Sequence, residues 1–516
     1  MTFTRRGPSG GVPPTKIARF AERFVLAARQ FVAGQAESTL VLSALLAFAA
    51  LWMLYDTLST ATVDAHWDNS EASLWAEHFA FGYKHPPMTA WLFALWFSVF
   101  PRQAWAAHLL NVTVITAGLG VTWRLLRNHL DRNRALFGLA ALFLIPLYDI
   151  KTEVFNANIV MIPFWAVALL FYLRARRGLG IFDSFLAGAC ASLTVLGKYW
   201  AFFLIAGMAA AAVTGAGTRR FWRSSAPYVM AAGAAIVVAP HIIWFVIERG
   251  GANYIFLRDT MTTTESFGAV AVRSGYYLLG AAAHAIGPLI LLAALRPSRS
   301  ALADITWPSD IDRQQALVLF VVPLVLPALV NLAMPYRLTP DWTFPNWALL
   351  PIVLYGGRAL TVDENAVAGA GLVALAATVV ALVASPFVAF QRPRSDEESF
   401  RQHFQEVAEL GEHLAGKPVA LYWGSPQMIA GLPFYWPAAE PLMGDPLLAE
   451  GRARITASGL LIVCLDSDAP CRKSATAFAG AGARSTGVTA TRSFLGFSGP
   501  PMSFTLTAVP GELSAQ

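Results

Sequence analysis

The sequence has little charge for its length. Of its 516 residues, 14% are charged and 56% are hydrophobic, whereas a soluble domain carries about 25% charged and about 45–50% apolar residues. It holds only three cysteines, too few for a small secreted scaffold held by disulfides. The scarcity of charge excludes a soluble enzyme and a disordered chain, and it predicts many membrane-spanning segments.

Nucleotide-binding and metal-binding signatures are missing too. The sequence contains no phosphate-cradling Gly-Lys-Ser loop, no His-Glu-x-x-His and no paired Cys-x-x-Cys. A donor substrate is therefore expected to be reached through the membrane. No cofactor is firmly implied and no residue is assigned to a metal; a requirement for a divalent metal ion stays open but unsupported. The net charge of +6 falls in short loops between apolar runs, which is a membrane pattern and not a nucleic-acid one.

Long apolar runs recur along the first three quarters of the chain. We expect about 11 of them to cross the hydrocarbon core, which is about 30 Å thick. They lie at 39–56, 105–126, 135–148, 158–173, 182–197, 199–215, 226–247, 270–294, 315–334, 346–360 and 366–389. A shorter run at 88–100 ends at Pro101 and is expected to lie at the membrane interface. The chain is thus predicted to be an all-α polytopic membrane protein.

Basic residues fall in the loops on one side of these runs. Arginine clusters lie at 124–134, 174–177, 219–223 and 296–313. The positive-inside rule then places the N-terminus in the cytoplasm and the loop at 57–104 outside. Three parts are expected: a basic amphipathic segment at 1–38, a transmembrane domain at 39–389, and an outer domain at 390–516.

The expected outer domain has a different composition from the rest. Short β-rich runs lie at Pro418–Tyr422, Gly459–Leu465 and Ser503–Val509, after a stretch at about 396–415 that is expected to be helical, which predicts a small α/β domain. Cys464 and Cys471 flank six residues. If this domain lies on the oxidising, outer side of the membrane, the two cysteines can form a disulfide that closes a short loop. The alternative is that they remain two free thiols.

The loop at 57–104 holds the most informative polar residues. Asp68 and Glu71 are three residues apart, so that on a helix both carboxylates face one way. Lys84 and His85 follow. This set suits a reaction in which a carboxylate takes a proton from a hydroxyl and cations hold a leaving phosphate. The alternative is a solvated acidic loop in which Asp68 caps a helix.

Further polar residues lie at the ends of later runs. Lys198 stands between two apolar runs, and its burial at a helix centre would cost about 2.5–3.5 kcal/mol. It therefore needs an anionic partner, such as a lipid phosphate, or a route to the interface, which Tyr199 suggests. Arg337 is a candidate phosphate or carboxylate ligand. The substrate-binding candidates are Asp149, Lys151, Glu153, Asn156, Asn158, His241 and Arg258. For the two asparagines the alternative is an ordinary helix cap, and for His241, which lies within an apolar run, the alternative is packing.

Several motifs occur in a fixed order. They are Trp67-Asp-Asn-Ser-Glu, Trp75-Ala-Glu-His, Gly82-Tyr-Lys-His-Pro-Pro, Phe155-Asn-Ala-Asn, Gly197-Lys-Tyr-Trp and Pro240-His-Ile-Ile-Trp. Over about residues 40–350 the sequence resembles the bacterial glycosyltransferases of the GT-C fold, in the dolichyl-phosphate-mannose protein mannosyltransferase-like superfamily (glycosyltransferase family 39 and relatives). It looks most like the branch with the rhizobial lipopolysaccharide galacturonosyltransferases and the lipid A aminoarabinose transferase.

The resemblance implies an inner-membrane enzyme that moves a sugar from a polyprenyl-phosphate carrier to lipid A, a core oligosaccharide or another acceptor on the periplasmic side. It implies Asp68 as general base and Glu71 as a second acid. It also places Lys84 and His85 in a cationic segment and Lys198 near the lipid phosphate. Its second-loop acid falls on Asp149 or Glu153.

One alternative in mechanism and one in function stay open. In mechanism, a single displacement inverts the configuration at the anomeric carbon, whereas a path that retains this configuration needs a nucleophilic carboxylate close to the first one. A transporter or flippase of a lipid-linked substrate predicts ionisable groups near the bilayer midplane and paired broken helices.

Overall fold

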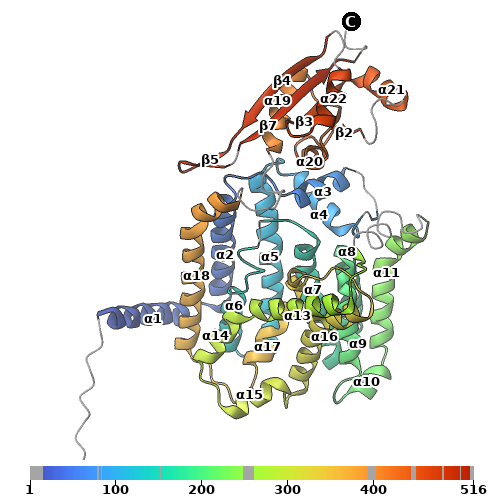
Figure 1. Cartoon of the computed structure of the whole chain (residues 1–516). Helices are drawn as coiled ribbons and strands as arrows, with labels where there is room; N and C mark the ends of the chain where they lie inside the picture. The colour runs from blue at the N-terminus through green and yellow to red at the C-terminus, as the bar shows by residue number, and fades with distance from the viewer. Residues whose placement is uncertain are drawn as a thin grey trace, which may run out of the picture.

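The protein consists of a bundle of helices and a mixed α/β domain that lies against one end of it (Figure 1). The computed structural model describes residues 16–77, 81–82, 84–151, 153–247, 261–392, 403–442, 449–478, 482–499 and 501–511. The end of the bundle that contacts the α/β domain is called the tail side below, and the domain formed by residues after 402 is called the tail domain.

Within the described residues, six helices are long and apolar enough to cross a membrane. They are α2 (Glu37–Ser59), α5 (Ala104–Arg127), α7 (Ala157–Gly178), α11 (Ala226–Ile247), α16 (Ile311–Ala333) and α18 (Glu364–Gln391). A bent pair, α13 (Phe267–His284) and α14 (Ile286–Ala294), gives a seventh span if it is counted as one, with an angle of 48° between its halves.

This number is lower than the expected count of about eleven, because the remaining apolar runs form shorter helices. They are α6 (Arg132–Leu142), α8 (Ile181–Gly197), η1 (Tyr199–Ala201) with α9 (Phe202–Ala212), and η3 (Pro340–Leu349) with α17 (Leu350–Tyr355). A helix rises 1.5 Å per residue, so the 11 residues of α6 cover only about half of the hydrocarbon core.

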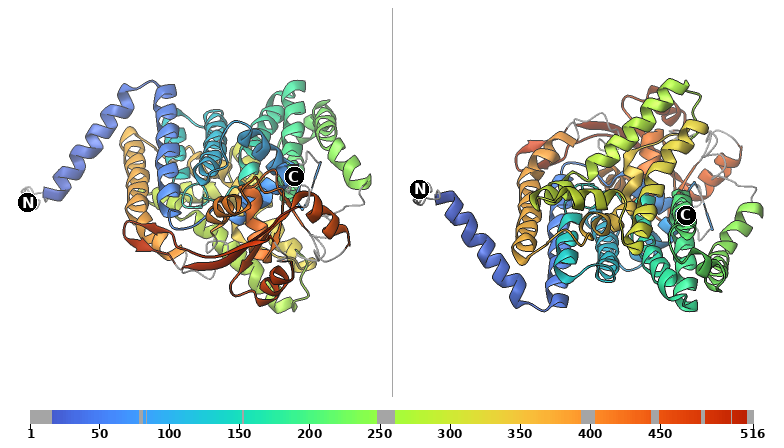
Figure 2. Two further views of the ribbon diagram at one scale, coloured as in Figure 1. Left: turned by 90° about the horizontal axis from the view of Figure 1, so that it is seen from above. Right: turned by 90° about the horizontal axis from the view of Figure 1, so that it is seen from below.

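Short helices complete this part of the chain. They are α1 (Lys16–Gly34), α3 (Trp67–Ala76), α4 (Met88–Phe97), α10 (Thr218–Trp222) and α15 (Arg299–Thr306). Helix α1 contacts α18 and projects sideways from the bundle (Figures 1 and 2). Helix α4 corresponds to the short apolar run at 88–100. It lies with α3 between the bundle and the tail domain (Figure 1).

Small residues bring α8 and α11 into close contact. A Cβ atom at Gly188 would lie 1.8 Å from the carbonyl oxygen of Met230, and one at Gly233 would lie 2.4 Å from that of Phe185. Glycines of this kind let membrane helices approach through their backbones. The opposite face of α11 exposes large apolar side chains, among them Ile243, as expected for a helix surrounded by lipid.

The tail domain contains a five-stranded sheet in the order β2-β1-β3-β7-β4. Its strands are β1 (Leu421–Gly424), β2 (Glu440–Pro441), β3 (Leu460–Leu465), β4 (Arg484–Ala490) and β7 (Met502–Val509), and β5 (Ser493–Phe494) pairs with β6 (Phe497–Ser498). Strand β1 pairs in parallel with β2 and β3, whereas β7 is antiparallel to β3 and β4. The helices are α19 (Phe404–Ala415), α20 (Pro426–Gly431), η6 (Leu432–Phe434), α21 (Ala449–Ser458) and α22 (Ala469–Phe478). Cys464 and Cys471 form a disulfide.

Candidate active site

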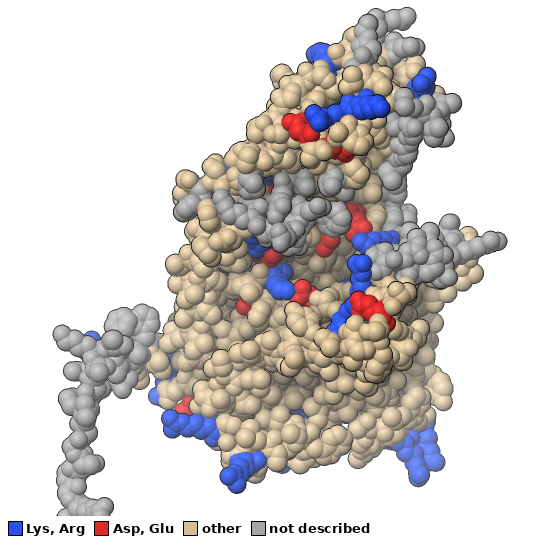
Figure 3. Space-filling model, in the orientation of Figure 1, with Lys and Arg blue, Asp and Glu red and all other residues tan. Residues whose placement is uncertain are grey.

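A cavity of about 500 Å³ opens at the tail side of the bundle. It is bounded by α3, the start of α4, the start of α7, the break between α8 and η1, and the segment that joins α16 to η3. Figure 3 shows acidic and basic side chains around the hollow on one face of the molecule, below the tail domain. The cavity thus lies at one end of the helices and not at their middle.

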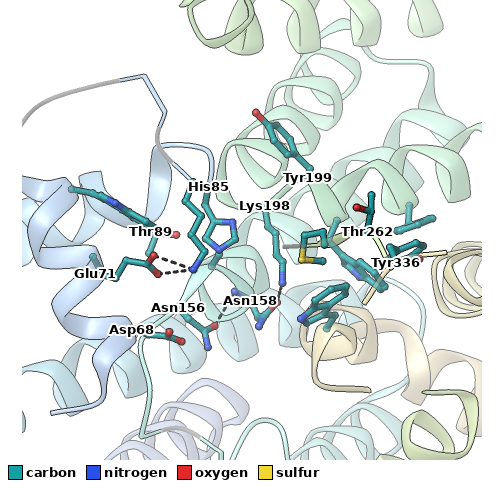
Figure 4. Close-up of a pocket in the computed structure, with 18 residues that line it drawn as sticks. Asp68, Glu71, His85, Thr89, Asn156, Asn158, Lys198, Tyr199, Thr262 and Tyr336 are labelled. Carbon is teal, nitrogen blue, oxygen red and sulfur yellow. Dashed lines mark hydrogen bonds and ion pairs between the residues drawn. The ribbon is translucent and has the colours of Figure 1, made fainter. Parts of the chain in front are cut away.

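The acidic wall of the cavity is α3. His66 caps this helix, because its Nδ1 accepts a hydrogen bond from the backbone N–H of Asp68 at 3.1 Å. The alternative in which Asp68 is the cap is therefore wrong, and its carboxylate remains available to the cavity (Figure 4). Glu71 lies on the same face and forms an ion pair with Lys84, at 3.0 and 3.2 Å from Nζ to its two carboxylate oxygens.

The ionisation of Glu71 is set by two opposing effects. Burial raises the pKa of Glu71, and the charge of Lys84 opposes this increase. The nearby carboxylate of Asp68 adds a smaller increase to the pKa of Glu71. Two carboxylates with different partners therefore stand side by side: Glu71 is paired with the ammonium group of Lys84, and Asp68 lies 3.9 Å from Nδ1 of His66.

The basic wall of the cavity centres on Lys198, between α8 and η1. Its Nζ donates a hydrogen bond to Asn158 Oδ1 at 2.8 Å (Figure 4). It also lies 4.3 Å from the ring centre of Trp342. Burial lowers the pKa of Lys198 to about 7, and the charge of Asp68 acts in the opposite direction. A partly buried ammonium with neutral contacts is well suited to receive an anion.

The side chains of the two asparagines at the start of α7, Asn156 and Asn158, make different hydrogen bonds. Asn156 caps the helix, since its Oδ1 accepts from the N–H groups of Asn158 and Ile159 at 2.9 and 3.4 Å. The cap interpretation of Asn156 therefore holds, although this residue also lines the cavity. The side chain of Asn158 is instead committed to Lys198.

His85 and Tyr199 also line the cavity. Burial, together with the charges of Lys198 and Lys84, lowers the pKa of His85 well below its ordinary value, so His85 is neutral at physiological pH. The hydroxyl of Tyr199 lies 2.9 Å from His241 Nε2. His241 contacts the carbonyl of Phe81 through its other ring nitrogen and is not among the lining residues, which fits its packing alternative.

Several expected site residues lie elsewhere. Lys151 pairs with Asp341 at 2.6 Å, and Glu153 pairs with Arg392 at 3.0 Å near the end of α18. The carboxylate of Asp149 accepts from the N–H of Ile150. None of these three candidates lines the cavity, and neither does Arg337, which is exposed. Arg258 lies outside the described residues. Lys151 and Glu153 are instead engaged in salt bridges with other elements of the chain.

Sequence reasoning missed the aromatic and small polar part of the wall. The missed residues are Trp75, Thr89, Trp200, Phe203, Met261, Thr262, Tyr336 and Trp342. Trp200 and Trp342 meet edge to face at 5.1 Å between ring centres. Their signal was present in the tryptophans beside Lys198 and after Pro340, but an aromatic residue near a membrane interface has many other uses.

The chemistry available in the cavity follows from these contacts. A carboxylate and a partly buried ammonium face one space that has an apolar aromatic wall. Within the described residues, no three His, Cys, Asp or Glu side chains come together in a way that could hold a metal ion. The arrangement can accept a proton at Asp68 and bind an anionic group at Lys198.

Three comparisons connect this chain with known proteins. Residues 84–244 match the family described as dolichyl-phosphate-mannose-protein mannosyltransferase. The lipid A galacturonosyltransferase RgtD of Rhizobium johnstonii is 24% identical over 307 residues, which cover 59% of this chain and 61% of RgtD. The match thus spans about three fifths of that relative.

The fold has solved counterparts. The crystal structure of ArnT from Cupriavidus metallidurans bound to undecaprenyl phosphate superposes with a TM-score of 0.57 at 14% identity, over 92% of this chain and 98% of ArnT. The apo state of the same protein gives a TM-score of 0.55 at 13% identity over the same shares. The resemblance seen in the sequence is therefore confirmed: the chain is similar to RgtD in sequence and shares the fold of ArnT.

Proposed function

We propose that this protein is a membrane glycosyltransferase that moves a sugar from a polyprenyl-phosphate donor to a lipid-linked acceptor of the cell envelope, such as lipid A. The observation that supports this most strongly is the pairing of Asp68 and Lys198 in one cavity. The relatives add support, because ArnT was crystallised with undecaprenyl phosphate and RgtD is named for the sugar it transfers to lipid A.

The reaction requires one base and one anion site. An acceptor hydroxyl gives its proton to Asp68 while its oxygen forms a bond to the anomeric carbon. The bond from that carbon to the phosphate oxygen breaks, and the polyprenyl phosphate leaves with the bonding electrons. Lys198 stabilises the charge that develops on this phosphate. No general acid is needed, since a phosphate ester is a good leaving group.

The different roles proposed for the two carboxylates favour a reaction that inverts the configuration at the anomeric carbon. Glu71 is held by the ammonium of Lys84 at 3.0 Å, whereas Asp68 lies 3.9 Å from the imidazole of His66, and in this proposal Asp68 is the carboxylate that takes the proton. A single displacement on the face opposite the phosphate inverts the anomeric centre. In this proposal Glu71 fixes Lys84 at the cavity, and the ammonium of Lys84 adds to the positive potential around the phosphate.

The cavity is proposed to face the periplasm. Helices α10 and α15 lie at the end of the bundle opposite the tail domain (Figure 1), and Lys and Arg gather at that end on the visible face (Figure 3). Basic loops mark the cytoplasmic side, so the tail domain and the cavity would lie on the other side of the inner membrane.

The transporter alternative predicts ionisable groups at the middle of the helices. The cavity instead takes its ionisable groups from α3, from the loop before α4 and from the break after α8, which supports transfer at a surface.

The proposal is tested with the full-length protein in lipid vesicles that contain lipid A. The vesicles receive undecaprenyl phosphate linked to galacturonic acid, aminoarabinose, mannose or galactose in turn. We expect one donor to add its sugar mass to the acceptor in mass spectrometry. Mass spectra of envelope glycolipids from a deletion strain should lack the same sugar. Movement of the donor between leaflets without a new glycosidic bond would support a transporter and overturn the proposal.

A further inference from the structure

Helix α3 lies between the bundle and the tail domain (Figure 1), and it forms one wall of the cavity. Asp68, Glu71 and Trp75 line the cavity, and their spacing of three and four residues places them on one helical face. Ser70 and Ser73 lie on another face, and both are completely buried. One short helix therefore connects the carboxylates of the site with a separate domain.

The buried serines bind the backbone of the tail domain. Ser70 Oγ donates to the carbonyl of Gly431 at 2.9 Å, and Ser73 Oγ donates to the carbonyl of Pro433 at 2.8 Å. These acceptors belong to the turn from α20 into η6. A Cβ atom at Gly431 would lie 2.0 Å from the ring of Phe404, so the turn is packed tightly against α19.

A second set of contacts fixes the chain just before α3. The buried carboxylate of Asp64 receives the guanidinium of Arg492 at 3.1 Å, the N–H of Gln405 at 2.9 Å, and the hydroxyl of Tyr435. Arg492 also pairs with Glu406 at 2.7 Å. A buried charge pair is costly to break, because removal of one partner leaves the other unpaired.

An aromatic contact extends this attachment to α4. Phe434 lies 6.1 Å from Phe93 and 5.6 Å from Phe97, measured between ring centres, and it belongs to the main core of the bundle. The tail domain is thus attached to both helices beside the cavity, although no cavity-lining residue in the described part of the chain belongs to it.

We infer that the tail domain positions α3 for transfer, with Ser70 and Ser73 as positioning residues that set where Asp68 meets the acceptor. This inference rests on the proposed function. Helix α3 has only 10 residues, and isolated helices shorter than about 12–15 residues are marginal in water. Its geometry therefore depends on contacts on its far face. A misplacement of a reacting group by about 1 Å can cost about a hundredfold in rate.

The test compares full-length protein with the double variant Ser70→Ala/Ser73→Ala. We expect kcat to fall about 10- to 100-fold, while the Kd for undecaprenyl phosphate, whose proposed ligand Lys198 is not on α3, stays within about twofold. Hydrogen exchange of the peptide at 67–77 should become faster. The matched control is Ser485→Ala/Thr489→Ala, which removes two hydroxyls that form hydrogen bonds within the tail domain. It should leave kcat, the Kd for undecaprenyl phosphate and the hydrogen exchange of the peptide at 67–77 unchanged.

The outcomes separate this inference from the proposed function. If the wild-type protein has no transfer activity, the proposed function is overturned. The difference in hydrogen exchange of α3 between the wild type and the double variant then still shows whether the tail domain holds this helix. Active wild-type protein with an unaffected double variant overturns only the inference. Equal losses of kcat, donor binding and folded protein would also overturn it, since they indicate general destabilisation. If the double variant does not purify, Ser73→Ala alone, which keeps one of the two bonds, should show a smaller fall in kcat.

Discussion

Lys198 donates its hydrogen bond to Asn158, 2.8 Å away, from a position above the ring of Trp342. Both contacts are neutral, so they hold the ammonium in place without cancelling its charge. Burial lowers the pKa of Lys198 to about 7, which makes its charge sensitive to pH in the physiological range. A phosphate that enters the cavity favours the charged form.

This relationship predicts a pH dependence for donor binding. Below about pH 7 the amine of Lys198 is protonated, and above that value the free protein loses the charge, so binding of undecaprenyl phosphate should weaken as the pH rises. Lys198→Arg keeps its charge at every accessible pH and should lack this decline. Lys198→Ala should weaken binding about tenfold or more at low pH. Fluorescence titrations in detergent at pH 6 and pH 9 measure this. The same decline in wild type and Lys198→Arg would exclude Lys198 as its cause.

The role of Asp68 predicts a loss of turnover without a loss of donor binding. Asp68→Asn keeps the size of the side chain but cannot take a proton, so kcat should fall by about 10²–10⁴. The control is Asp131→Asn, at the cap of α6, because asparagine caps helices as well as aspartate does. Wild-type turnover by Asp68→Asn would remove this residue from the mechanism.

The ion pair between Glu71 and Lys84 predicts the acid limb of the pH–rate profile. Burial raises the pKa of Glu71 and Lys84 lowers it, so activity that needs the ionised pair should fall as the pH drops through this raised value. Lys84→Met removes the opposing charge and should move the limb to higher pH. Glu71→Gln should remove the contribution of Glu71 to the limb. Steady-state rates from pH 4 to pH 8 measure both effects, and a limb that is identical in all three proteins would contradict the assignment.

The contact of α8 with α11 predicts that Gly188 cannot carry a methyl group. The new Cβ atom would meet the carbonyl oxygen of Met230, so Gly188→Ala should destabilise the bundle by about 1–3 kcal/mol. Gly369 in α18 has open space around it, and Gly369→Ala should leave stability equal or slightly higher. Thermal unfolding in detergent compares the two. Equal midpoints would show that α8 and α11 can separate without cost.

The disulfide of the tail domain predicts a local loss of stability on its removal. Cys464 and Cys471 are seven positions apart, and a closed loop of this size is worth about 2–3 kcal/mol. The double variant Cys464→Ser/Cys471→Ser should make the tail domain more sensitive to limited proteolysis. Cys190→Ala, in α8 of the bundle, is the control and should leave the cleavage rate of the tail domain unchanged.

Local sequence determined the helices and the face of α3 that carries the carboxylates. Apolar runs of sufficient length must fold as helices in a membrane, because backbone groups find no other partner there. The spacing of Asp68 and Glu71 sets their common direction for the same local reason. The sequence indicated Lys198 only through the free-energy cost of burying its charge. The motifs around Lys198 are among those on which the resemblance to the family rests.

Tertiary structure alone decided which of these polar residues share a cavity. Nothing local in the sequence separates Glu153, which pairs with Arg392, from Glu71, which reaches the site. The choice depends on partners 239 residues apart in the chain. The same holds for the attachment of α3 to the tail domain and for the number of full-length spans. Each of these depends on how distant helices pack and bend around one another, and a pattern of neighbouring residues carries no record of that packing.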